Sequence, residues 1–127
     1  MSDLNVVDSS AWLEYFADTP RAANFEAAIE DSEDLIVPII TIYEVFKKVL
    51  RERGEAEALQ CASVMQCGEV VELDLALAMD AAHHKLPLAD SLIYATALSR
   101  GATLWTQDEH FKDLPGVRYF ANERSCE

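Results

Sequence analysis

The sequence predicts an α/β fold of three layers, in which helices cover both faces of a central parallel sheet of about five short strands. Short apolar runs alternate with longer stretches whose apolar residues recur at helical spacing. This alternation is typical of βαβ units, whose parallel strands lie buried between helices. The chain has 127 residues and half of them are apolar. We therefore expect one domain over residues 1–127, with a core that needs no disulfide.

The first half of the chain contains two apolar runs that are rich in β-branched residues and too short for helices. Each is followed by apolar residues at helical spacing. The elements expected here are a strand at Leu4–Val7, a helix capped by Ser9 or Ser10, a helix from Arg21 to about Asp31, a strand at Leu35–Val37 and a helix at Ile39–Arg53. Pro20 at the start of the second helix and Gly54 after the last one support these boundaries.

The second half continues the same alternation. The elements expected here are a helix at Glu55–Cys67, a strand beginning at Val70, a helix from Asp74 to Ala82, a linker at Leu86–Leu88, a helix at Ala89–Arg100, a strand at Thr103–Thr106 and a strand at Val117–Phe120. Gly68 and Gly101 directly follow two of these helices, where glycine commonly ends a helix.

The chain is strongly acidic, with 23 Asp and Glu, 10 Lys and Arg and a formal net charge of −13. This charge argues against simple electrostatic binding to nucleic acid or anionic lipid. The sequence contains no apolar window of about 18 residues, and its first residues do not resemble a secretory signal. We therefore expect a cytoplasmic protein that does not enter a membrane. The cysteines, which lack zinc-finger spacing, are expected to be reduced thiols.

Two acids stand where predicted strands end, the edge at which parallel sheets bind ligands. Asp8 directly follows the first strand, and Asp108 stands two residues after the strand that ends at Thr106. Either acid could instead cap the helix that follows, although Ser9 or Ser10 could cap the first helix. Glycine-rich phosphate loops, a serine nucleophile motif and zinc-ligand spacing are absent. The remaining carboxylates and hydroxyls are hard oxygen ligands that suit Mg²⁺ or Mn²⁺.

Two further acids have weaker support from position alone. Asp90 lies in the first turn of a predicted helix, where the helix dipole favours an acid. The apolar segment Leu86–Ala89 precedes it, so its side chain need not be fully exposed. Glu44 lies opposite the apolar stripe of its helix, and an ion pair with Lys48 one turn later would explain it as a surface residue.

Four short motifs, taken together, resemble those of the PIN-domain ribonucleases and occur in that family's order. The motifs are Val6–Trp12, Thr41–Val45, Ala89–Ala97 and Leu104–Phe111. One such motif would mean little in a chain with 23 acids, but four in order, within a resemblance that spans nearly the whole chain, form a specific pattern. In size, the chain is most similar to the VapC-type toxins of toxin–antitoxin pairs.

The resemblance implies a metal-dependent endoribonuclease that hydrolyses RNA phosphodiester bonds, together with a cognate antitoxin partner and a homodimer. The matched acids, which would be catalytic and would bind one or two Mg²⁺ or Mn²⁺ ions, are Asp8, Glu44, Asp90 and Asp108. Ser9 and Thr106 match supporting hydroxyl positions, whereas Glu109 and His110 match no ligand position. Four neighbouring carboxylates would not all stay ionised unaided, and a divalent ion removes that repulsion.

One cationic cluster follows Glu44 on the same predicted helix. It comprises Lys47, Lys48, Arg51 and Arg53. The first three are candidates for contacts to RNA phosphates beside the acidic site. A solvated helix face, balanced by neighbouring glutamates, is an equally good explanation of the cluster.

The aromatic residues of the first two helices allow two interpretations. Trp12 and Phe16 are expected in the core. Tyr15 and Phe25 could belong either to the core or to a surface that packs against an antitoxin, as the resemblance to small PIN toxins implies.

Other functions can be weighed against this one, and the sequence disfavours the receiver and phosphatase types among them. A PIN nuclease that acts in RNA maturation would carry the same motifs as a toxin. A non-catalytic module could hold Mg²⁺ in an acidic pocket, but a receiver domain would place paired acids after the first strand, where only Asp8 stands. A phosphatase of the haloacid dehalogenase type would require an aspartate at position 10, which is a serine.

Overall fold

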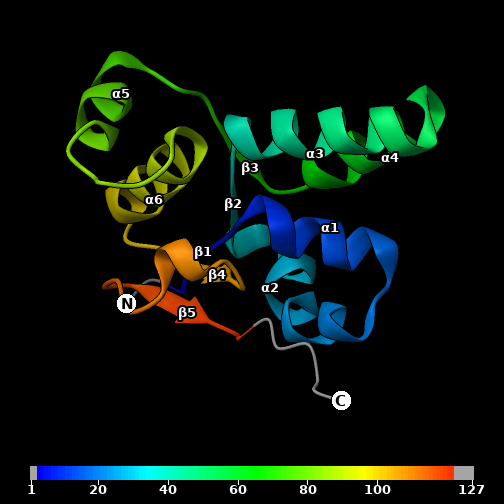
Figure 1. Ribbon diagram of the computed structural model, residues 1–127, viewed down its shortest axis with the longest axis horizontal. Coiled ribbons are helices and arrows are strands. Elements are labelled where there is room, and N and C mark those ends of the chain that lie inside the picture. Colours follow the sequence, from blue (N-terminus) through cyan, green and yellow to red (C-terminus); the bar gives the residue numbers. More distant parts are fainter. Residues whose placement is uncertain (1–2, 122–127) are drawn as a thin grey trace.

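The computed structural model describes residues 3–121, and five short parallel strands form one sheet at its centre (Figure 1). The strands are β1 (Asn5–Val7), β2 (Leu35–Pro38), β3 (Glu69–Val71), β4 (Thr103–Thr106) and β5 (Val117–Tyr119), in the order β3-β2-β1-β4-β5. The chain proceeds outward from β1 to β3 and then returns to the other side of β1. The strand order therefore reverses between β1 and β4, the position at which open parallel sheets bind ligands.

Helices cover both faces of this sheet. They are α1 (Ser9–Ala17), η1 (Pro20–Asn24), α2 (Glu26–Glu30), η2 (Ser32–Asp34), α3 (Ile39–Arg53), α4 (Glu55–Met65), α5 (Leu75–Ala81), α6 (Leu88–Arg100) and η3 (Glu109–Phe111). Figure 1 shows α1 to α4 gathered on one side of the strands, with α5 and α6 on the other. This arrangement confirms the predicted three-layer α/β/α fold. No helix among residues 3–121 is long and apolar enough to span a membrane.

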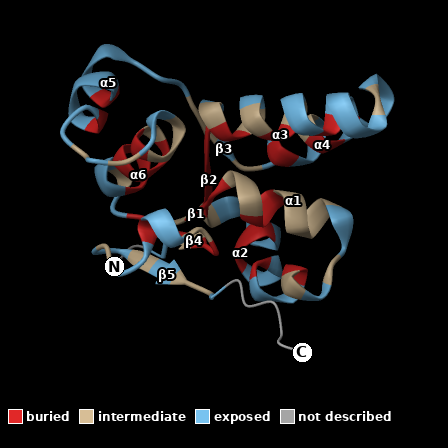
Figure 2. Ribbon diagram, viewed as in Figure 1, coloured by how far each residue is buried: buried red, intermediate tan, exposed pale blue. Residues whose placement is uncertain are grey.

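Alternate residues of the central strands supply two separate cores, because successive side chains of a strand point to opposite faces. Val7 and Val37 pack with α1 to α4, around the fully buried Trp12. Val6 and Leu104 pack instead with α6 and η3. Figure 2 shows these buried residues along the strands and on the inner faces of the helices. Strands buried on both faces form a rigid support for side chains that leave their carboxyl ends.

The structure differs from the predicted elements mainly between β1 and β2. The helix expected over residues 21–31 is divided into η1 and α2 at Phe25, whose ring is fully buried and meets Phe120 with 5.3 Å between ring centroids. Phe25 therefore belongs to the core. Tyr15 is only partly buried, and its hydroxyl donates a hydrogen bond to Glu30 at 3.2 Å. Phe16 is also partly buried and stacks on the core residue Trp12.

Candidate metal centre

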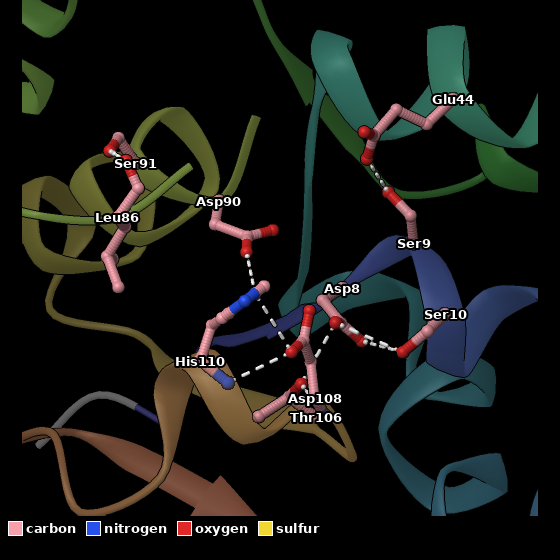
Figure 3. Close-up of polar contacts among 10 residues, drawn as sticks. All are labelled: Asp8, Ser9, Ser10, Glu44, Leu86, Asp90, Ser91, Thr106, Asp108 and His110. Atoms are coloured by element: carbon pink, nitrogen blue, oxygen red, sulfur yellow. Dashed lines mark hydrogen bonds and ion pairs between the residues drawn. The ribbon is translucent and has the colours of Figure 1, made fainter. Parts of the chain in front are cut away.

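The acids singled out in the sequence come from four separate elements and line one cavity of about 310 Å³ (Figure 3). Asp8 follows β1, Glu44 lies on α3, Asp90 is in the first turn of α6, and Asp108 follows β4. Ser9 and Lys48 also line this cavity. The cavity lies where the strand order reverses, so the topology brings together acids that are up to 100 residues apart in the chain.

Asp8 is the most deeply buried of these acids, with 3% of its surface exposed. One carboxylate oxygen accepts a hydrogen bond from the Ala11 amide at 3.1 Å, and the other accepts one from the Thr106 hydroxyl at 2.9 Å. Burial nevertheless raises the pKa of Asp8 from 3.8 to about 7, because these hydrogen bonds only partly replace solvation of the charge. The negative charge of Asp108 raises the pKa further.

Asp8 also corrects one expectation from the sequence. The acid itself caps α1 through the Ala11 amide, which was the alternative to a cap by Ser9 or Ser10. Ser10 instead donates to the Asp8 carboxylate, with its hydroxyl 3.2 Å from each oxygen. The same carboxylate therefore caps α1 and lines the cavity. Asp108 combines the two in the same way, since it accepts from the amide of His110 at the start of η3.

Thr106 connects Asp8 to the loop that carries Asp108. Its side chain is fully buried, donates to Asp8 and accepts a hydrogen bond from the backbone amide of Asp108 at 2.9 Å. One hydroxyl thereby fixes the carboxylate after β1 relative to the backbone after β4. Thr106 lies behind the acids and is well placed to support them.

Glu44 faces the cavity, although helical periodicity suggests a surface residue. Its carboxylate accepts a hydrogen bond from the Ser9 hydroxyl at 2.5 Å, across the space between α1 and α3 (Figure 3). The alternative ion pair with Lys48 does not form, because the Lys48 ammonium lies 2.9 Å from Glu52 one turn further along α3. Ser9 thus orients Glu44, and the Lys48 side chain remains at the rim of the cavity.

Asp90 and Asp108 lie on the opposite side of the cavity, next to His110. The imidazole Nδ1 of His110 is 2.8 Å from a carboxylate oxygen of Asp90 and 3.2 Å from one of Asp108. Partial burial and the charge of Asp108 raise the pKa of Asp90, while the hydrogen bond with His110 lowers it. The charge of Asp108 and the hydrogen bond to Asp90 raise the pKa of His110.

His110 is the residue at this site that the sequence analysis did not select. It matches no ligand position of the family resemblance, and nothing in its spacing places its ring beside Asp90, which stands 20 residues earlier. The only local signal is Asp108, which stands two residues earlier. The η3 turn provides the contact, because it rotates the ring back over the acid at the start of α6.

The start of α6 is held by a side-chain contact and a backbone contact. The Ser91 hydroxyl donates to the Leu86 carbonyl at 3.0 Å, and the Ser91 amide donates to the Pro87 carbonyl at 2.8 Å. The helix begins at Leu88, inside the segment predicted as a linker. These bonds fix the first turn of α6, and with it the direction of the Asp90 side chain.

The cationic residues of α3 are only partly associated with the acidic cavity. Lys48 lines it, whereas Lys47 lies over the ring of Tyr43, with its ammonium 5.5 Å from the ring centroid. Arg51 is exposed one turn beyond Lys47. Arg53 pairs with Glu57 at 3.1 Å. The predicted contact residues thus follow one exposed arc of α3 that begins at the rim of the cavity.

The donor set fits a hard divalent cation. Four carboxylates supply oxygen ligands of the type preferred by Mg²⁺ and Mn²⁺. The raised pKa values of Asp8 and Asp90 show that the carboxylate charges are poorly compensated by the protein alone. A cation placed among them would remove this penalty. The arrangement can therefore concentrate positive charge at the carboxyl edge of the sheet.

A second, larger cavity of about 400 Å³ adjoins the acidic one. It lies between α1, α3 and α4, and both cavities are lined by Leu13 and Lys48. Its lining includes the apolar residues Phe16, Val49 and Val64. All four candidate acids line the smaller cavity, and none of them lines the larger one.

Comparisons with known proteins agree with this architecture. A family model described as "PIN domain" matches residues 6–117. A comparison with curated proteins found no match.

Three solved structures have the same fold. A toxin–antitoxin complex from Klebsiella pneumoniae is 21% identical, with a TM-score of 0.72, over 90% of this chain and 95% of that chain. VapC20 from Mycobacterium tuberculosis, described as a sarcin–ricin loop cleaving toxin, is 16% identical, with a TM-score of 0.73. The match covers 89% of this chain and 96% of that chain. The DNA-bound VapBC from Salmonella typhimurium is 17% identical, with a TM-score of 0.72, and the match covers 94% of this chain and 98% of that chain.

Proposed function

This chain belongs to the PIN-domain family, as its motifs predicted, and on that premise we propose that it is a Mg²⁺- or Mn²⁺-dependent endoribonuclease. The observation that carries the proposal is the convergence of four carboxylates on one cavity at the reversal of strand order. The acids that would hold the ion and act in catalysis are Asp8, Glu44, Asp90 and Asp108. A bound divalent ion lowers the pKa of water and offsets the charge of a scissile phosphate.

The residues around these acids would keep the ligand oxygens in place. Thr106 holds one oxygen of Asp8, and Ser9 holds one oxygen of Glu44. Each hydroxyl leaves the carboxylate oxygens with further lone pairs for an ion. Hydrogen bonds of this kind fix the orientation of metal ligands and commonly change metal affinity by about 10–100-fold when they are removed.

The RNA backbone would pass along α3. Lys48 at the cavity rim is 45% exposed, and Lys47 and Arg51 continue the same exposed arc. Cations next to the acidic cavity would hold the phosphates that flank the scissile bond. The net charge of −13 would keep binding of RNA elsewhere on the surface weak.

We also propose that the nuclease is the toxin of a toxin–antitoxin pair and forms a homodimer. Two of the structures with this fold come from complexes described as toxin–antitoxin or VapBC. The acidic surface suits a basic antitoxin segment, and the cavity between α1, α3 and α4 offers it space beside the site. A short gene directly upstream that encodes a protein with a DNA-binding N-terminus would support the toxin role. Its absence would favour a PIN nuclease that acts in RNA maturation.

The catalytic proposal is tested with purified protein and matched single-stranded RNA, structured RNA and DNA. We expect cleavage of RNA in Mg²⁺ or Mn²⁺ and none in EDTA. Asp90→Asn should remove the activity. Glu109→Gln is the matched control, because Glu109 is an exposed acid beside Asp108 that does not line the cavity. Cleavage that persists in EDTA or in Asp90→Asn contradicts the proposal.

A further inference from the structure

We propose that His110 is a nitrogen ligand of the metal and makes the site prefer Mn²⁺ over Mg²⁺. This inference rests on the proposed metal-dependent function. It starts from the placement of a ring nitrogen beside two candidate ligands, Asp90 and Asp108. One atom from each of these three side chains lies within 4.8 Å of the other two, and no other group of this kind occurs among residues 3–121.

The two distances from the ring nitrogen match those between adjacent ligands of an octahedral site. Ligands at about 2.1 Å from an ion lie about 3.0 Å from each other at adjacent octahedral positions. The His110 Nδ1 lies 2.8 Å from the Asp90 oxygen and 3.2 Å from the Asp108 oxygen. The ring nitrogen is therefore spaced from each carboxylate oxygen as one ligand of an ion is from the next, and the two oxygens lie within 4.8 Å of each other.

The hydrogen bond identifies which nitrogen of the ring would bind the ion. Carboxylate oxygens can only accept, so the Nδ1 of His110 donates the hydrogen bond to Asp90 when no ion is bound. An imidazole nitrogen binds a metal through the lone pair at that same position, in place of the proton. The nitrogen that would bind the ion therefore already faces the acids, and a turn of the ring or of the Asp90 carboxylate would place an ion between them.

The nature of the ligand atom sets the expected preference. Mg²⁺ binds oxygen ligands and keeps several waters, whereas imidazole nitrogen is a ligand of transition-metal ions. Asp8 and Glu44 supply only oxygen to the cavity. A single nitrogen from His110 would thus strengthen the binding of Mn²⁺ while adding little to that of Mg²⁺.

The test uses His110→Ala in the full chain, with Mn²⁺ alone and Mg²⁺ alone as probes. The backbone amide of residue 110, which donates to Asp108 at 2.9 Å, is unchanged by this substitution, so the position of Asp108 is preserved. The matched control is His83→Asn, because His83 is exposed and does not line the acidic cavity. Binding is measured by calorimetry, and the ligand atoms by pulsed electron paramagnetic resonance of bound Mn²⁺.

We expect nitrogen coupling to bound Mn²⁺ in the wild-type protein and in His83→Asn, and its loss in His110→Ala. The Mn²⁺ dissociation constant should rise about tenfold or more in His110→Ala, whereas that of Mg²⁺ should change little. Saturable Mn²⁺ binding without nitrogen coupling in the wild-type protein overturns the role of His110 alone. Absence of saturable binding of either ion overturns both this inference and the proposed metal dependence.

Discussion

Replacement of Asp8 by asparagine should stabilise the protein in the absence of divalent ions. Asp8 is 3% exposed and its pKa is raised from 3.8 to about 7, so its ionised form is disfavoured in the folded state. Asparagine keeps the shape of the side chain without the charge. Its oxygen can accept from the Ala11 amide, and its amide group can donate to the Thr106 hydroxyl.

The magnitude follows from proton linkage. Between pH 3.8 and about 7 the folded state binds more protons than the unfolded state, so the contribution of Asp8 to stability falls as the pH rises. The pKa of Asp8 differs by about 3 units between the unfolded and folded states, and each unit corresponds to about 1.4 kcal/mol. Above pH 7 the charge of Asp8 therefore lowers the unfolding free energy by at most about 4 kcal/mol. At pH 5 the same relation gives a smaller loss of unfolding free energy, of about 2 kcal/mol. The advantage of Asp8→Asn should therefore increase over this range.

The assay is urea-induced unfolding in EDTA at pH 5 and pH 7.5, with and without Mn²⁺. In EDTA, Asp8→Asn should be the more stable protein, by about 2–4 kcal/mol at pH 7.5. Mn²⁺ should stabilise the wild-type protein and have little effect on the variant, because binding to the native state adds to its stability. The reasoning is refuted if Asp8→Asn is less stable in EDTA, or if Mn²⁺ stabilises both proteins equally.

Three further variants test other parts of the structure. The double variant Lys47→Gln, Arg51→Gln should bind RNA more weakly and flatten the slope of its salt dependence by about 1.4. An unchanged slope, or an equal flattening in the control Lys85→Gln, rejects the contact between α3 and RNA phosphates. Thr106→Val should lower the unfolding free energy by about 1–3 kcal/mol, measured in urea against the exposed control Thr103→Val. Gly68→Ala should lower the thermal midpoint, because its Cβ would lie 2.8 Å from the Leu35 carbonyl oxygen; an unchanged midpoint contradicts that geometry.

The fold was predictable because its signals are local. Hydrophobic period and glycine or proline at boundaries located four strands to within one residue at each end, and the start of β3 to within one residue. The helix expected over residues 21–31 was the main error, since its apolar spacing does not show that the chain must bend to bury Phe25 beside Phe120. That contact joins residues far apart in the sequence, and only the tertiary structure specifies it.

The site was predictable to different degrees for different residues. Asp8 and Asp108 stand at strand ends, and the structure places both in one cavity. Glu44 was selected from the family motif alone. Helical periodicity could not place it in the cavity, because its side chain is oriented by Ser9, which lies on another helix. His110 reaches Asp90 through the η3 turn, so no spacing rule connects the two residues. Local sequence patterns do not show which side chains from distant elements will be in contact.

The strong negative charge has a specific consequence at this site. Four of the 23 acids line the cavity, and burial and mutual repulsion raise the pKa of Asp8 and of Asp90. Without a cation, this edge of the sheet would repel phosphate. A divalent ion would reverse the local charge balance, so an acidic protein can still act on RNA.

The ends of the RNA products test the central claim most directly. Hydrolysis by water activated at the carboxylate cavity predicts products with a 5′-phosphate and a 3′-hydroxyl, formed in Mg²⁺ or Mn²⁺ and absent in EDTA. End-labelled RNA and mass spectrometry of the fragments distinguish these ends from 2′,3′-cyclic phosphates. Cyclic phosphate products, or cleavage that is unaffected by EDTA, would show that the four carboxylates do not perform the reaction through a metal ion.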